Sequence, residues 1–149
     1  MQDFNYVIIG AGSAGCVLAN RLSESGKYSV LVLEAGGSDK RFWIQVPIGY
    51  GKTYYQKSVN WMYMADADEG TNNRQSYWPR GKVLGGSSAI NAMIYIRGHK
   101  ADFDAWEAAG NPGWGYKDVL PYFKRSETNQ LGEDKFRGGK GPLHVADVS

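Results

Sequence analysis

The feature that most constrains the fold is a glycine-rich turn between a short apolar run and an amphipathic segment. Residues 6–9 (YVII) are apolar and rich in β-branched side chains, which is typical of a buried parallel strand. Three glycines follow in a G-x-G-x-x-G pattern: Gly10, Gly12 and Gly15. Apolar residues then recur at helical spacing over residues 17–22, and residues 30–33 (VLVL) have the composition of a second strand. This order predicts a strand–helix–strand unit that binds a dinucleotide.

Each part of this unit has a physical role in binding a phosphate. Gly10 permits the tight turn, Gly12 lets the backbone approach a pyrophosphate, and Gly15 lets the helix pack close to the strand. The free N–H groups at the start of the helix then receive the negative charge. Glu34 ends the second strand, where a carboxylate accepts hydrogen bonds from a ribose diol and repels a 2′-phosphate. NADP is therefore disfavoured, whereas NAD and FAD both fit this unit.

A second glycine-rich stretch, residues 78–98 (WPRGKVLGGSSAINAMIYIRG), favours FAD. FAD is the longer cofactor, and its isoalloxazine ring must be held along one edge and covered on one face. Gly85 and Gly86 allow backbone to lie against such a flat ligand, and Ser87 adds a small hydroxyl group. Asn91 can bind ring or ribitol heteroatoms, and we expect the following apolar residues to form a strand.

Two basic residues stand in this stretch, Arg80 and Lys82. Either could offset the charge of a pyrophosphate, and a solvated surface position is the alternative for each.

The same stretch resembles the first signature of the glucose–methanol–choline (GMC) family of FAD-dependent oxidoreductases. The matching positions are Gly81, Lys82, the glycine pair, the two serines, Asn91, Tyr95, Gly98 and Asp104. The N-terminal glycine pattern and residues 113–127 and 139–145 also resemble that family, so the likeness covers essentially the whole chain. It is strongest with the choline dehydrogenase-like and aliphatic alcohol dehydrogenase branch.

The resemblance implies a set of residues that bind FAD non-covalently. Those implied at the pyrophosphate are Gly10, Gly12, Ser13, Ala14 and Gly15, and Arg80 is a further candidate there from its charge alone. Glu34, beside Ala35, is implied at the adenosine ribose. Val83 and the backbone of Asn91, Ala92, Met93 and Ile94 are implied near the flavin, which adds to Gly85, Gly86 and Ser87, already assigned to the cofactor from their small size. Some members of the family attach FAD covalently through a histidine at the position just before Asn91. Ile90 occupies that position here, so non-covalent binding is expected.

The predicted fold class is α/β, a Rossmann-like FAD-binding domain with a parallel sheet, incomplete, followed by the start of a substrate-side region. We expect residues 1–140 to be the N-terminal part of an FAD-binding domain, and residues 141–149 to begin a truncated substrate-binding region. A turn leading into a β-like run at the C-terminus predicts a chain that ends inside a larger protein. Exposed sheet edge and flavin-facing apolar surface would then favour self-association.

Residues 36–81 have few clean periods and are expected to form a long loop region with short β elements. Loops of this length tend to be functional, and the family resemblance implies that this one covers the cofactor or the substrate. Trp61 and Tyr63 alternate as strand residues do, and simple packing is the favoured role for them. Residues 100–111 and 115–127 predict core helices, with Pro121 tolerated only near a helix start.

The chain's reactive side chains offer no catalytic residue. The single cysteine, Cys16, is expected to be a small buried packing residue. A structural role is favoured for His99 over a role near the flavin, and nothing recommends His144 as a base. No histidines and carboxylates have metal-ligand spacing, and no serine lies in a nucleophile elbow. The resemblance places the catalytic base, a histidine paired with histidine or asparagine, beyond residue 149.

The composition excludes some partners and favours one compartment. The net charge of +2 is scattered, which argues against a nucleic-acid surface, and no window approaches the length of a membrane span. One cysteine and no signal peptide predict a cytoplasmic protein, and attachment at the periphery of the inner membrane stays open.

Three functions follow from these patterns. The first is the N-terminal portion of an FAD-dependent dehydrogenase or oxidase that converts a primary alcohol, choline-like or aliphatic, to an aldehyde, with quinone or oxygen as acceptor. Its partners are the alcohol and the C-terminal remainder of the same protein. The alternatives are an NAD-dependent Rossmann dehydrogenase and a non-catalytic dinucleotide-binding remnant. Lyases and a photodecarboxylase also exist in the family, and this segment does not distinguish them.

Overall fold

The computed structural model describes residues 3–147 and divides into two compact units, one ending at Ile94 and the other beginning at Tyr95. The boundary expected near residue 140 separates cofactor-binding from substrate-binding regions, and it stays a prediction.

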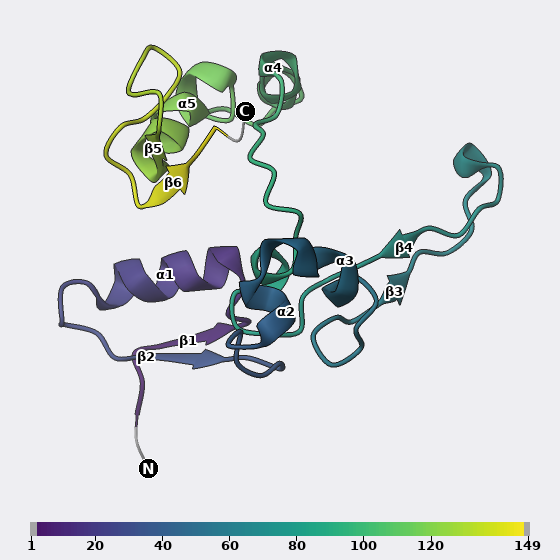
Figure 1. The fold of residues 1–149 in the computed structure, drawn as a ribbon. Helices are drawn as coiled ribbons and strands as arrows, with labels where there is room; N and C mark the ends of the chain where they lie inside the picture. Colours follow the sequence, from purple (N-terminus) through teal and green to yellow (C-terminus); the bar gives the residue numbers. More distant parts are fainter. Residues whose placement is uncertain (1–2, 148–149) are drawn as a thin grey trace. The chain divides into compact units, whose positions relative to one another are not determined.

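The first unit opens with the predicted strand–helix–strand arrangement (Figure 1). Strand β1 (Tyr6–Ile9) pairs in parallel with β2 (Val30–Leu33), with Tyr6 opposite Val30 and Ile9 opposite Leu33. Helix α1 (Ser13–Ser23) connects them and begins directly after Gly12. The turn after the helix needs a positive φ of +68° at Gly26, which glycine adopts without strain. The Rossmann-like α/β prediction is therefore confirmed at its first motif.

The expectation that these strands are buried is wrong for the described residues. Val7 is 55% exposed and Ile9 is 87% exposed, because the sheet has only two strands within residues 3–147. An apolar strand composition predicts burial in a multi-stranded sheet. In the part of the chain that the structure describes, α1 packs against both strands and no third strand joins them.

Short elements occupy the middle of the first unit. The antiparallel pair β3 (Tyr63–Met64) and β4 (Tyr77–Trp78) forms a ribbon with the turn η2 (Glu69–Thr71) at its end (Figure 1). The other elements are α2 (Phe42–Gln45), η1 (Pro47–Gly49), α3 (Tyr50–Thr53) and η3 (Gly86–Ala89). The short β elements were expected. The one-turn helices were not, because four residues are too few for a helical period to be recognised.

The core of the first unit lies beneath the second glycine-rich stretch. Val59, Val83 and Ile90 are buried against one another, and Ile44 and Ala89 pack on them. The amide of Asn60, only 1% exposed, joins three segments around this core. Its Nδ2 donates to the Tyr54 carbonyl at 2.8 Å, and its Oδ1 accepts from the N–H groups of Met62 and Arg80 at 2.9 Å each.

The strand expected after Asn91 is absent. Residues 91–99 form no strand, and Met93 has a left-handed φ of +59°. That conformation is incompatible with an extended strand. The apolar run here was therefore a wrong indicator of secondary structure.

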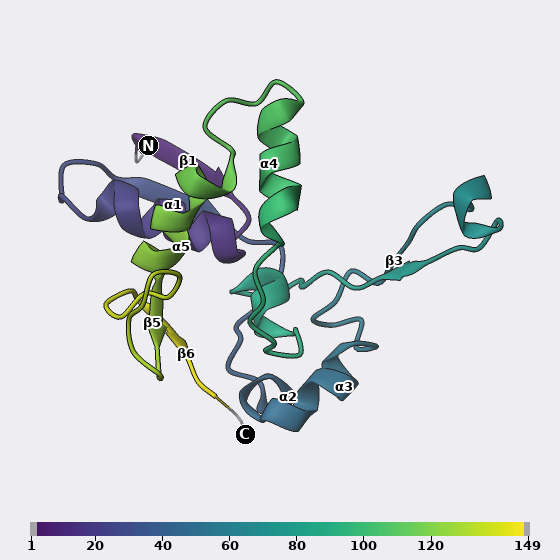
Figure 2. The same ribbon diagram turned by 90° about the horizontal axis from the view of Figure 1, so that it is seen from above.

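Up to residue 147, the second unit contains two helices and a two-stranded parallel sheet, whose elements are labelled in Figure 2. Helix α4 (Lys100–Ala108) precedes α5 (Tyr116–Ser126), which leads directly into β5 (Glu127–Asn129). Strand β5 pairs with β6 (Leu143–Val145). The ring of Phe103 contacts those of Trp106, Tyr116 and Phe123 at centroid distances of 5.4 to 6.1 Å. Both predicted helices are confirmed, and Pro121 is tolerated in the second turn of α5.

Two reactive side chains have structural positions. His99 caps α4: its Nδ1 accepts from the N–H of Ala101, and the Asp102 carboxylate accepts from the N–H of His99. The structural role favoured for His99 agrees with this geometry. Cys16 is exposed and donates through Sγ to the Ala11 carbonyl at 3.3 Å, so the expectation of a buried cysteine is wrong. Cys16 is exposed because it lies on a face of α1 that is open to solvent.

Between residues 3 and 147, no helix is long and apolar enough to cross a membrane. Within the same residues, no group of three or more histidine, cysteine, aspartate or glutamate side chains is arranged to hold a metal ion.

Candidate cofactor-binding site

A cavity of about 400 Å³ lies in the first unit where β1, β2 and the second glycine-rich stretch meet. Its lining residues are Ile9, Gly10, Gly12, Leu33, Glu34, Ala35, Trp61, Tyr63, Arg80, Gly81, Gly86 and Ser87. This volume is in the range of small-molecule and cofactor sites in proteins. The cavity contains both predicted glycine motifs together with the predicted acid.

The first glycine loop is shaped by close backbone contacts. The N–H of Gly10 donates to the carbonyl of Leu33 at 2.7 Å, which ties the loop to the end of β2. A Cβ at Gly15 would overlap the carbonyl oxygen of Gly10, so only glycine allows α1 to approach the strand. The start of α1, with its unpaired N–H groups and positive dipole end, is thereby held beside the cavity.

The second glycine loop packs directly on the first. A Cβ at Gly86 would lie 2.8 Å from the Cα of Gly12, and Gly86 has a left-handed φ of +58°. The N–H of Gly85 donates to the Ala11 carbonyl at 2.8 Å. The hydroxyl groups of Ser13 and Ser88 are hydrogen-bonded at 3.0 Å. The two glycine motifs therefore form one site, although they are more than seventy residues apart in sequence.

The carboxylate of Glu34 is held by backbone on both sides. Oε2 accepts from the N–H of Ala11 and Oε1 from the N–H of Gly36, each at 2.8 Å. Each carboxylate oxygen has further lone pairs, so these bonds orient the group without exhausting its capacity to accept from a ligand hydroxyl. Glu34 thus links the first loop to the residues after β2 and also lines the cavity.

Two aromatic side chains border the cavity. Simple packing was the role that the sequence favoured for both of them. Trp61 is 41% exposed and Tyr63 is 51% exposed, so neither is buried in a core. Their rings are nearly parallel, with an interplanar angle of 6° and centroids 5.9 Å apart. Met62, between them, has a left-handed φ of +56°, so the two rings come together at a turn, which the alternating W-x-Y spacing does not record.

The two basic residues of the second stretch have different positions. Arg80 lines the cavity, and its guanidinium carbon lies 5.1 Å from the centre of the Trp78 ring. Lys82 does not line the cavity. Its Nζ lies 4.5 Å from the centre of the Trp61 ring. Of the two, only Arg80 lines the cavity, and its guanidinium donates to the Pro79 carbonyl at 2.7 Å.

The predicted site residues fall into three groups. Those that line the cavity are Gly10, Gly12, Glu34, Ala35, Arg80, Gly86 and Ser87. Those adjacent to it in the packed loops and the first turn of α1 are Ser13, Ala14, Gly15 and Gly85. Those elsewhere are Val83, Asn91, Ala92, Met93 and Ile94. Val83 is fully buried in the core, so its side chain supports the loop from beneath.

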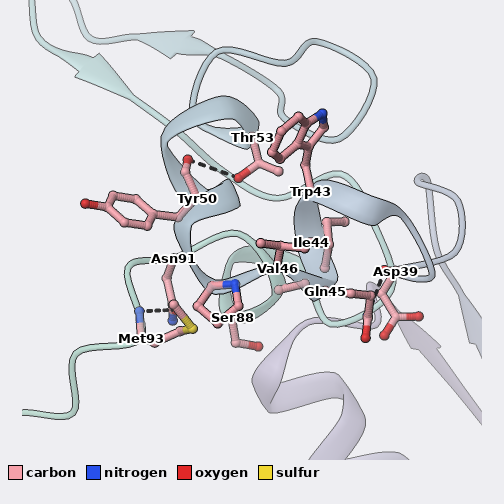
Figure 3. Close-up of a pocket in the computed structure, with 12 residues that line it drawn as sticks. Asp39, Trp43, Ile44, Gln45, Val46, Tyr50, Thr53, Ser88, Asn91 and Met93 are labelled. Carbon is pink, nitrogen blue, oxygen red and sulfur yellow. Dashed lines mark hydrogen bonds between the residues drawn. The ribbon is translucent and has the colours of Figure 1, made fainter. Parts of the chain in front are cut away.

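Asn91 and Met93 line a second cavity of about 230 Å³ (Figure 3). Ser88 and Asn91 face the apolar side chains of Ile44 and Val46 across it. The Asn91 side chain accepts from the N–H of Met93 at 2.8 Å, which fixes the left-handed turn there. The turn η3 lies between the two cavities, with Ser87 lining one and Ser88 the other.

One titration shift lies near the site. Burial raises the pKa of the Tyr77 phenol, and the neighbouring Tyr54 and Tyr55 act in the same direction. The hydrogen bond from Asn60 opposes this shift. The phenol donates to the Tyr54 carbonyl at 2.5 Å, so Tyr77 anchors the ribbon to the segment after α3.

Comparisons with known proteins agree with this geometry. The sequence profile of the family described as GMC oxidoreductase matches residues 4–149. An oxygen-dependent choline dehydrogenase of Vibrio vulnificus (strain YJ016) is 55% identical over 142 residues, which are 95% of this chain and 25% of that protein. The chain thus spans about a quarter of the length of the curated relatives it matches.

Solved structures match over the same extent. Pyridoxine 4-oxidase from Mesorbium loti superposes with a TM-score of 0.85 at 41% identity, over 95% of this chain and 28% of that one. A formate oxidase of Aspergillus oryzae RIB40, studied for its FAD modification, has a TM-score of 0.81 at 33% identity over 96% of this chain and 26% of that one. With its two glycine motifs joined in one site, the chain belongs to the GMC oxidoreductase family.

Proposed function

We propose that this chain is the FAD-binding portion of an oxidoreductase that converts a primary alcohol to an aldehyde. The observation that carries the proposal is the contact between the two glycine loops, at Gly12 and Gly86, beside a cavity with an acid and an open aromatic wall. A nicotinamide cofactor needs only the first loop. The second loop suits the longer FAD.

The residues present fit the adenosine and pyrophosphate part of FAD. Gly12 and Gly86 have no Cβ where a bound pyrophosphate would approach backbone, and the start of α1 provides free N–H groups. Arg80 supplies a positive charge on the cavity wall, and Glu34 is oriented to accept from a ribose hydroxyl. The open rings of Trp61 and Tyr63 provide an apolar surface for a base.

The flavin end is proposed to lie toward residues 91–94. Asn91, Ala92, Met93 and Ile94 are all exposed, and the left-handed turn at Met93 leaves their backbone groups accessible. Bound FAD would supply the acceptor for the hydride that leaves the alcohol carbon. The residues of this chain bind and orient the cofactor, and the second cavity beside Asn91 is the proposed position for a small alcohol.

We assign the removal of the alcohol proton to no residue of this chain. The resemblance to choline dehydrogenases supports a choline-like alcohol, with oxygen as one acceptor. The resemblance to pyridoxine 4-oxidase supports other primary alcohols. Choline-like and aliphatic substrates therefore both remain in the proposal, as do a cytoplasmic location and peripheral membrane attachment.

FAD attachment is proposed to be non-covalent. Ile90 occupies the position at which some relatives carry a linking histidine, and it is 7% exposed and packed against Val59 and Val83. A buried isoleucine offers no nucleophile to the ring.

The test is the visible absorption spectrum of the purified protein before and after acid precipitation. Flavin bands that move entirely to the supernatant are expected. Bands retained in the pellet would contradict the non-covalent assignment. A protein that stays colourless after incubation with excess FAD, and instead binds NAD, would overturn the FAD proposal.

A further inference from the structure

We infer that Lys82 is a positioning residue that acts on the cofactor through Trp61. The inference rests on the proposed FAD site and goes beyond it, because Lys82 does not line the cavity. Its ammonium group lies 4.5 Å from the centre of the Trp61 ring, within the range of a cation–π interaction.

The backbone already brings Lys82 and Trp61 together. The N–H of Trp61 donates to the Arg80 carbonyl and the N–H of Lys82 donates to the Val59 carbonyl, both at 2.8 Å. These two bonds bind the segment before β3 to the segment after β4. The main chain at Trp61 is therefore fixed, and the orientation of its ring depends on the side chains around it.

Two groups act on that ring. Lys82 is over one face of the indole, and Tyr63 lies parallel to it with centroids 5.9 Å apart. Trp61 is nevertheless 41% exposed, so close packing does not immobilise it. Lys82 is half-buried, which weakens solvent screening of its charge and strengthens its attraction to the indole face.

This arrangement pre-organises the wall of the nucleotide cavity. If the Trp61 ring samples several orientations, only a fraction of the molecules has the ring ready to stack on the adenine base of the cofactor. The apparent Kd equals the intrinsic Kd divided by this fraction, so a smaller fraction gives a higher apparent Kd. Lys82 raises the fraction by holding the ring in one orientation before the ligand arrives. Its charge acts on the indole, whereas Arg80 faces the cavity itself.

The test is a double-mutant cycle on FAD affinity in the full-length protein. Lys82→Met is expected to raise the Kd for FAD about threefold to tenfold, the effect of losing one cation–π interaction. In a Trp61→Leu background the same substitution is expected to change the Kd less than about twofold, because the ring it acts on is absent. Lys82→Arg keeps a cation over the ring and is expected to restore binding.

The matched control is Lys57→Met, which removes a positive charge at an exposed position that lines neither cavity. An equal effect of Lys82→Met in both backgrounds would show that Lys82 acts as a charge on the phosphates and would overturn the inference. An unchanged Kd when Lys82→Met is made in the protein that keeps Trp61 would also overturn it.

A second measurement needs no cofactor. The acrylamide quenching of Trp61, obtained as the difference between proteins with and without the Trp61→Leu substitution, is expected to increase when Lys82 becomes methionine. Unchanged quenching would overturn the inference even if FAD binds. If no variant binds FAD and the quenching still increases, the proposed function fails while the contact between Lys82 and Trp61 stands.

Discussion

In the unit that ends at Ile94, two glycine loops and two aromatic rings border an open cavity, whereas in the unit that begins at Tyr95 a carboxylate is completely enclosed by the groups that bind it. Trp61 and Tyr63 keep much of their surface open, but Glu127 is 0% exposed. The first unit leaves binding capacity for a ligand. The second uses its polar groups to stabilise itself.

The enclosed carboxylate shows this difference in detail. Glu127 accepts hydrogen bonds from Asn129 at 2.9 Å and from the N–H of Gly138 at 3.2 Å, and it pairs with Arg97 and with Arg137. Burial by itself would raise the pKa of Glu127, but these hydrogen bonds and the two guanidinium charges together hold the pKa below its usual value. Folding therefore favours the ionised form of the Glu127 carboxylate.

The largest effect is expected when this enclosure is broken. Glu127→Gln leaves the buried Arg97 guanidinium without its counter-charge, so we expect the protein to lose about 3 kcal/mol or more of stability. Hydrogen exchange of the second unit measures the loss locally. Exchange in β1 and β2 is the internal control, and equal acceleration in both units would contradict a separate role for the cluster.

The corresponding change in the first unit is Gly86→Ala. The new Cβ would meet the Cα of Gly12 at 2.8 Å in a left-handed backbone, so the two loops must separate. We expect the Kd for FAD to rise about 100-fold, since an ångström of misplacement in a positioned site has effects of this order. Titration of the flavin absorbance measures it.

The control for that variant is Gly113→Ala in the second unit. Gly113 is also left-handed, with φ of +86°, but a Cβ there meets no atom within 4 Å. Its cost is the conformational strain of about 1 kcal/mol, with FAD affinity unchanged. If both variants bind FAD equally well, close approach of the loops is not what the site requires.

A smaller effect is expected from acidification. Because the pKa of Glu127 is lowered on folding, its contribution to stability is fully present above its unfolded pKa and is lost as the pH falls through the folded pKa. The stability advantage of the wild type over Glu127→Gln is therefore expected to shrink below about pH 4. Denaturant unfolding of both proteins between pH 7 and pH 3 measures it, and a constant difference would be the contrary result.

The smallest effect concerns one hydroxyl pair between the loops. Ser13→Ala removes the hydrogen bond between the hydroxyl groups of Ser13 and Ser88. Because this hydrogen bond is exposed to solvent, its loss is expected to raise the Kd for FAD only about twofold to fivefold. Ser58→Ala, outside the cavity, serves as the control. A rise as large as that of Gly86→Ala would place Ser13 in direct contact with the phosphates.

Much of the first motif could be predicted because its signals are local. Residues 6–33 carry strand composition, helical spacing and glycines in contiguous order, and the structure confirms each element. The strand expected after Asn91 failed because an apolar run does not distinguish a strand from an exposed turn. The burial expected for Cys16 failed because amino-acid type indicates only an average environment.

The sequence by itself determined the dinucleotide motif, the family likeness and the two helices after residue 99, since these depend on residues close together in the chain. Only the tertiary structure decided that Gly12 meets Gly86, that Trp61 and Tyr63 line the cavity and that Glu127 is enclosed. Such contacts join segments separated by many residues. Their geometry depends on how the intervening chain folds, and no local period or composition records it.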